Sequence, residues 1–206
     1  MVETHGDNPF ERYGERWPRQ DDSLFVSGGD VWIADSVGER NYRLDKGYKL
    51  AGDVLVENFL GEPKDHDNLI YPILFCYRHY IEIALKEIIE KHGPWFEIAL
   101  TRRDHKLPEL WRAFEQIAVA YQNDPSNEAC RAVSACIDEL SEYDPVSVVF
   151  RYATDRKTAA LNRLDFTSID LANLRDVMNG IANFLECASY DFDSKRDAVM
   201  EMASRL

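Results

Sequence analysis

Apolar residues recur at steps of three and four along most of the chain, and this spacing is typical of amphipathic helices. The spacing predicts helices at residues 46–60, 67–92, 107–122, 126–141 and 170–190. Glycine or proline follows most of these runs, which places helix ends there. Residues 194–205 are a further amphipathic segment, either helical or frayed. We therefore expect a mainly α protein, an antiparallel helical bundle of four or five core helices, because short breaks join consecutive helices.

Two segments depart from the helical pattern and predict one or two small β-hairpins. In the first, short apolar runs flank Gly28-Gly29-Asp30, a combination favoured at hairpin turns. The Gly-Gly pair lacks the residues that would complete a phosphate-binding loop. In the second, residues 146–152 (VSVVFRY) and 165–169 are candidate strands. We expect residues 1–45 to be an N-terminal arm that includes the first hairpin, and residues 46–206 to be the helical domain.

Composition narrows the class of protein. The 206 residues carry a net charge of −13, with 45% hydrophobic and 30% charged residues, which is typical of a soluble globular protein. No run is long and uncharged enough to span a membrane, and the N-terminus lacks the pattern of a signal peptide, so we expect a cytoplasmic protein with no membrane partner. The cysteines form no CxxC pair and the histidines no HExxH motif. We therefore expect reduced thiols, no metal and no cofactor.

The charge is distributed unevenly along the chain. A strongly acidic protein repels a polyanion, which counts against a general nucleic-acid binder. Residues 115–144 have a net charge of −6, whereas residues 101–112 and 151–163 have net charges of +2 and +3. If the two basic segments meet in space, they form a local basic surface.

The most informative feature is a polar stripe on the otherwise apolar helix predicted at residues 67–92. At about 100° per residue, four polar side chains share about 100° of this helix: Arg78, His79, Glu82 and Lys86. Arg78, Glu82 and Lys86 follow one another at four-residue steps, as in an ion-pair ladder. Because buried charge is costly unless paired, the stripe is either a structural network or a functional site. In a functional site His79 is a candidate base and Arg78 a candidate phosphate ligand.

A second candidate site precedes the helix predicted at residues 107–122. His105 lies just before this helix, and Arg102 and Arg103 lie next to it in the sequence. Helix N-termini and basic side chains both favour anions, so this segment is a candidate binding site. The alternative is a capped helix with a basic surface turn.

A third candidate is Arg151, between Phe150 and Tyr152 in the segment predicted as a strand. An arginine in an apolar strand needs a carboxylate, a carbonyl or a ligand as its partner. We expect Glu82 to be that partner if the pairing is structural. If it is functional, Arg151 and Tyr152 contribute to binding.

Four segments together resemble a group of uncharacterised bacterial proteins: YPILFCYRHYIEIALKEII, HKLPELW, DPVSVVFRYATDR and IDLANLRDVMNGIANFLE. They contain an Arg-His helix, a His-x-Leu-x-x-Leu-Trp motif and a late Phe-Arg-Tyr motif. The group is similar to the HEPN superfamily of helical bundles. The resemblance covers residues 48–188 and leaves the first 45 residues outside it.

The resemblance implies a small α-helical bundle, often a homodimer. Many HEPN-like proteins are metal-independent ribonucleases of phage defence, toxin–antitoxin pairs or RNA processing, and others are catalytically inactive binding modules. The active members carry an arginine followed, after four to six intervening residues, by a histidine. No histidine of this chain has an arginine at that spacing. Arg78 and His79 are adjacent, and Arg102 and Arg103 are too close to His105.

Three functional hypotheses follow. The first is a noncatalytic HEPN-like module of bacterial stress or defence, a homodimer that binds a protein, RNA or nucleotide partner. In it, four charged residues order the core or the dimer interface: Arg78, Glu82, Lys86 and Arg151. The second is a divergent metal-independent endoribonuclease, with His79 or His105 as the base and Arg78 or Arg151 as the stabilising cation. The third is a small-molecule sensor whose polar stripe lines a cavity in the bundle.

Overall fold

The computed structural model describes residues 24, 32–61, 67–99, 105–154, 164 and 168–205. The chain divides into two compact units, Met1–Ile33 and Ala34–Leu206. The first unit lies almost wholly outside the described residues, and so does the hairpin predicted around Gly28-Gly29-Asp30. The following description concerns the second unit.

The described part of the second unit is helical. It has five α-helices and two short 3-10 helices: α1 (Val37–Gly61), η2 (Asp67–Leu69), α2 (Ile70–His92), η3 (Gly93–Phe96), α3 (Leu107–Ala120), α4 (Glu128–Tyr143) and α5 (Leu171–Ser204). All five predicted helices are present, which confirms the mainly α prediction. Helix α1 begins nine residues earlier than predicted, at Val37 rather than at residue 46, and α5 continues without a break through the segment left open at 194–205.

The β-hairpin predicted after residue 145 is wrong where the chain is described, because residues 146–152 form turns instead of a strand. The carboxylate of Asp144 accepts hydrogen bonds from the backbone N–H groups of Val148 and Val149, at 2.6 and 3.1 Å. Ser147 adopts a left-handed backbone conformation with φ of 59°. The β-branched residues therefore fold back on the end of α4, and no strand occurs among the described residues. Most of the partner segment, residues 165–167, lies outside them.

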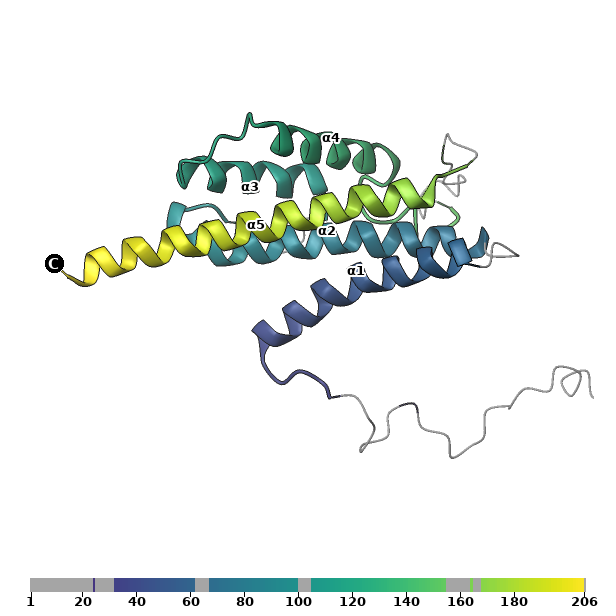
Figure 1. Cartoon of the computed structure of the whole chain (residues 1–206), viewed down its shortest axis with the longest axis horizontal. Helices are drawn as coiled ribbons and strands as arrows, with labels where there is room; N and C mark the ends of the chain where they lie inside the picture. Colours follow the sequence, from purple (N-terminus) through teal and green to yellow (C-terminus); the bar gives the residue numbers. More distant parts are fainter. Residues whose placement is uncertain are drawn as a thin grey trace, which may run out of the picture. The chain divides into compact units, whose positions relative to one another are not determined.

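Helix α2 is central to this unit and contacts α1, α3 and α5 (Figure 1). The rings of Tyr48 in α1 and His79 in α2 lie 4.4 Å apart, and Asp53 accepts a hydrogen bond from Tyr77, so these two helices are antiparallel. Gly52 allows their close approach, since a Cβ atom there would lie 2.4 Å from the ring of Tyr77.

Helices α3 and α5 run parallel to α2, which corrects the prediction of a fully antiparallel bundle. His105, two residues before α3, accepts a hydrogen bond from Arg78 through its main-chain oxygen, whereas Tyr121 after α3 is hydrogen-bonded to His92. The chain therefore returns along α2 between η3 and α3. The prediction failed because it assumed that every break between helices is a short turn that reverses the chain. The connection between η3 and α3 is instead long enough to extend back along several turns of α2.

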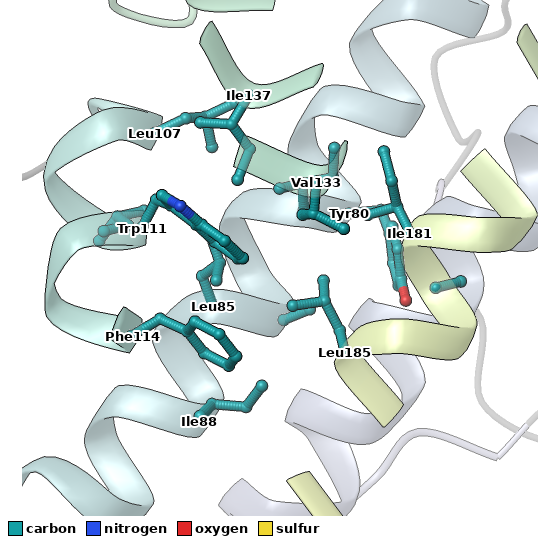
Figure 2. Close-up of a cluster of buried hydrophobic side chains, with 14 of the residues drawn as sticks. Tyr80, Leu85, Ile88, Leu107, Trp111, Phe114, Val133, Ile137, Ile181 and Leu185 are labelled. Carbon is teal, nitrogen blue, oxygen red and sulfur yellow. The ribbon is translucent and has the colours of Figure 1, made fainter. Parts of the chain in front are cut away.

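A single hydrophobic core joins α2, α3, α4 and α5 (Figure 2). The rings of Trp111 and Phe114 in α3 stack with centroids 4.8 Å apart, and both side chains are buried. Leu85 of α2 and Ile137 of α4 are fully buried in the same cluster. This packing fixes the positions of the polar side chains that project from α2.

Candidate functional site

Arg78 is the largest fully buried side chain of the described residues, with 0% of its surface exposed. All three nitrogens of its guanidinium donate to protein oxygens. Nη1 donates to Glu82 Oε2 at 2.9 Å, Nη2 to the main-chain oxygen of His105 at 2.7 Å, and Nε to the main-chain oxygen of Asp144 at 3.1 Å. Arg78 therefore ties the start of α3 and the end of α4 to the middle of α2.

Glu82 is the acidic centre of the same network and is only 2% exposed. Its Oε1 accepts from Lys86 Nζ at 2.8 Å and lies 2.7 Å from His105 Nδ1, while its Oε2 accepts from Arg78. Burial alone would raise the pKa of Glu82, but the hydrogen bonds from Lys86, His105 and Arg78 outweigh burial and lower it. Glu82 is therefore held as a carboxylate.

Asp144, at the C-terminal end of α4, completes the network. It is fully buried, and its Oδ2 lies 3.4 Å from Arg78 Nε. The sequence indicated only a helix break at Asp144-Pro145, and the pairing with Arg78 spans 66 residues. Two carboxylates, Glu82 and Asp144, thus balance two cations, Arg78 and Lys86, and we call these four residues with His105 the charge network.

His79 does not belong to the charge network, although it shares the predicted stripe. Its ring stacks on Phe75 at 5.3 Å and meets Tyr48 edge-on. Its Nδ1 is buried without a hydrogen-bond partner among the described residues, and burial lowers the pKa of His79. A neutral, aromatic-packed imidazole of this kind resembles a core histidine more than a catalytic base.

His105 has the opposite character. Its side chain is 57% exposed, and Nδ1 is held by the buried carboxylate of Glu82. A carboxylate that accepts from Nδ1 fixes the imidazole tautomer and leaves Nε2 to exchange protons. This arrangement is chemically capable of general base catalysis.

Arg151 pairs differently from the prediction. Its Nε donates to the main-chain oxygen of Ser147 at 2.7 Å, and its guanidinium lies 5.6 Å from the ring centres of both Phe75 and Tyr152. The expected pairing with Glu82 is therefore replaced. Glu82 already pairs with Arg78 and Lys86, and the turns after Asp144 place the main-chain oxygen of Ser147 within reach of Arg151. Arg102 lies outside the described residues.

Most of the two basic segments, residues 101–104 and 155–163, lies outside the described residues. A cavity of about 380 Å³ lies between α2, α4 and α5, with Leu74, Tyr77 and Met178 in its wall, and its lining includes neither Arg78 nor Glu82. All four cysteines are free thiols. In the part of the chain that the structure describes, no group of three or more His, Cys, Asp or Glu residues could hold a metal ion. None of the described helices combines the length and apolar character needed to cross a membrane.

Comparison with known proteins gives no relative on which to base a function. No protein-family model, curated protein or solved structure matches the chain. The chemistry of the site itself must therefore support any functional proposal.

Proposed function

We propose that the chain is a noncatalytic HEPN-like interaction module of a bacterial stress or phage-defence system, a homodimer that binds a protein, RNA or nucleotide partner. The observation that carries the proposal is the buried guanidinium of Arg78, whose three nitrogens all donate to protein oxygens. RNA cleavage needs a cation that reaches the phosphate in the transition state. In this chain the best-placed arginine is instead a structural tie.

The end of α5 supports the dimeric part of the proposal. Apolar residues repeat at alternating steps of three and four along this helix, from Leu171 to Phe192, and are covered by the bundle. Beyond Phe192 the same spacing passes through Lys195 and then reaches two apolar residues, Val199 and Met202, which are 58% and 71% exposed. Together with the half-exposed Trp95 they line a groove of about 540 Å³. A helix whose apolar face extends beyond the part that the bundle covers is typical of an interface.

A second copy of the chain fits this groove for electrostatic reasons. The chain has a net charge of −13, so two copies repel each other over most of their surfaces. Residues 194–205 instead carry three basic and two acidic residues. Contact between two such segments buries apolar surface with little repulsion.

Light scattering on the purified chain tests the dimer. We expect the mass of a dimer, and we expect Met202→Glu to give the mass of a monomer because it places a charge in the apolar groove. Val54→Glu is the matched control, since Val54 is also exposed but lies on α1, away from this groove. A monomeric native chain, or equal effects of both variants, would contradict this interface.

The noncatalytic part is tested with RNA. We expect no cleavage of a panel of single-stranded and structured RNAs in the presence of EDTA, whether or not these RNAs bind the chain in a gel-shift assay. Cleavage that copurifies with the folded chain would contradict the proposal.

A divergent metal-independent ribonuclease is the second candidate, and the contact between His105 and Glu82 favours it. In that enzyme Nε2 of His105 would take the proton of the 2′-hydroxyl, and Lys86, which is partly exposed beside Glu82, would face the phosphate. The same RNA panel separates the candidates. Cleavage abolished by His105→Ala but retained in His79→Ala would support the enzyme, because only His105 is exposed.

A further inference from the structure

A second group of charged residues lies on the other side of α2, where α1, α2 and α5 surround a cavity of about 290 Å³. Its acidic lining residues are Asp45, Glu87, Glu186 and Asp193, and its one basic lining residue is Lys46. We call this cavity the acidic pocket. Its volume is just below the usual range for small-molecule sites, about 300–1,000 Å³.

The basic residue of the acidic pocket is already occupied. Lys46 forms an ion pair with Glu186 and lies 6.0 Å from the ring centre of Tyr42. Asp193 is likewise paired, because Lys91 donates to its Oδ2 at 2.6 Å. Two carboxylates, Asp45 and Glu87, have no ion pair with any described residue.

Asp45 is the decisive residue. Its side chain is 92% buried, since only 8% of its surface is exposed, and its Oδ1 makes no hydrogen bond among the described residues. Burial raises the pKa of Asp45 to about 6, because the charge of Lys46, which lowers it, is outweighed by burial together with the negative charges of Glu87 and Glu186. A carboxylate in this position is costly, because no hydrogen bond from a described residue replaces the water that Oδ1 lost on folding.

Three tyrosines complete the lining. Tyr80 is buried in the floor, whereas Tyr42 and Tyr190 are 59% and 78% exposed at the mouth. Faces of aromatic rings attract cations, and rings combined with carboxylates are the usual means by which proteins bind ammonium groups.

We propose that the acidic pocket binds an organic cation, an alkylammonium or guanidinium group that pairs with Asp45 and Glu87 between the tyrosine rings. The group would supply the hydrogen bond that Asp45 Oδ1 lacks and would add positive charge to a lining in which four acids face Lys46. Two sources carry this chemistry: a free amine such as a polyamine, and an arginine or lysine side chain of a partner protein. The proposal is independent of RNA binding and of the groove at the end of α5.

Isothermal titration calorimetry of the full chain tests the pocket with three probes: spermidine, agmatine and a short glycine-flanked arginine peptide. We expect saturable binding of at least one probe with one site per chain. Preference for spermidine or agmatine would indicate a free amine, and preference for the peptide would indicate a side chain of a partner. Absence of saturable binding by all three up to roughly 10 mM, which corresponds to a very weak complex, would overturn the proposal.

Two carboxylate variants and a control establish the location. We expect Asp45→Asn to weaken binding by at least about tenfold and Glu87→Gln by a smaller factor, because each removes one partner of a charge pair. Glu90→Gln removes the same charge from the exposed side of α2 outside the pocket and should change affinity less than about twofold. Equal losses in Glu90→Gln and Asp45→Asn would show general attraction to an acidic protein and would overturn the site.

The variants also report on folding. Asp45→Asn keeps the shape of the side chain and removes the buried charge, so we expect the thermal midpoint of the ligand-free protein to rise by about 3 °C. A variant that is more stable and yet has lost the probe cannot have lost it through unfolding. A variant that is less stable than the native chain would indicate that Asp45 has a structural partner, and it would count against the proposal.

Discussion

Two groups of charged residues lie on opposite sides of α2, and they differ in balance. The charge network around Arg78 and Glu82 pairs each carboxylate with a cation, and all three nitrogens of the arginine are hydrogen-bonded. The acidic pocket around Asp45 has two carboxylates without ion pairs among the described residues. At about 100° per residue, Glu82 and Glu87 point about 140° apart on the same helix.

The difference separates stabilisation from binding. A buried charge with all its hydrogen bonds fixes the helices that it joins, and removing one partner is costly. A buried charge without partners lowers stability and is retained when a ligand uses it. The face of α2 that carries Arg78 and Glu82 is therefore mainly structural. The face that carries Glu87 is the better candidate for a ligand site.

The largest effect is expected from Arg78→Met. This change leaves Glu82 and Asp144 without their shared cation in a buried position, so we expect a loss of about 3–5 kcal/mol in the free energy of unfolding. Urea denaturation followed by circular dichroism measures it. Arg175→Met on α5 is the control, because Arg175 is partly exposed and its contact with Glu57 is long, at 4.0 Å. A loss below about 1 kcal/mol for Arg78→Met would mean that the charge network is not structural.

The next effect is expected from Glu82→Gln, which keeps the shape and removes the charge. We expect a loss of about 2 kcal/mol at pH 7, because hydrogen bonds from charged donors are weakened. The pKa of Glu82 is below its ordinary value of 4.5, so its contribution is complete above that pH and is lost as pH falls through the lower folded value. The difference between native chain and variant should therefore shrink on acidification below about pH 4. A constant difference down to pH 2 would contradict this.

Asp45→Asn should act in the opposite direction. Burial and neighbouring acids raise the pKa of Asp45 from 3.8 to about 6, so its ionisation opposes folding above that range. We expect the variant to be more stable by about 1 to 2 kcal/mol at pH 7.5, and we expect the gain to vanish below about pH 3, where the carboxyl is protonated in both states. The charged groups facing it are Lys46 on α1, Glu87 on α2 and Glu186 on α5. Denaturation curves at the two pH values measure the gain.

The smallest effect is expected from His105→Ala. Its side chain is mostly exposed, and its main-chain oxygen, which accepts from Arg78, is unchanged by the substitution. We expect a loss below about 1 kcal/mol by urea denaturation. A loss as large as that of Glu82→Gln would show that the imidazole, and not only its backbone, belongs to the structural tie.

Residues on one helix were the easiest to predict. The pairs Arg78–Glu82 and Glu82–Lys86 follow from four-residue spacing, and the structure has both. His79 is adjacent to Arg78 in the sequence, and a turn of about 100° was enough to place it among aromatic rings instead. Spacing within a helix thus predicted which residues share a face of α2. Only the packing between helices showed that His79 on this face is separate from the charge network.

Residues far apart in the sequence were not predictable. Asp144 and the main-chain oxygen of His105 complete the coordination of Arg78 from positions 66 and 27 residues away. The turns at residues 146–152 were mistaken for a strand because β-branched composition reports local preference, and the Asp144 carboxylate overrides that preference by binding two backbone N–H groups. Asp45 was not singled out, since it fell in the segment predicted as the N-terminal arm, one residue before the predicted helix.

By itself the sequence determined the helical class, the approximate helix positions and the charged ladder of α2, because periodicity and four-residue spacing are local properties. Only the tertiary structure decided that α3 runs parallel to α2, that Arg78 is fully coordinated and that Asp45 Oδ1 is buried without a hydrogen-bond partner among the described residues. Those outcomes depend on which distant side chains and carbonyls meet around α2. Burial turns an ordinary charge into either a structural tie or a candidate binding group, and burial is fixed by packing between helices.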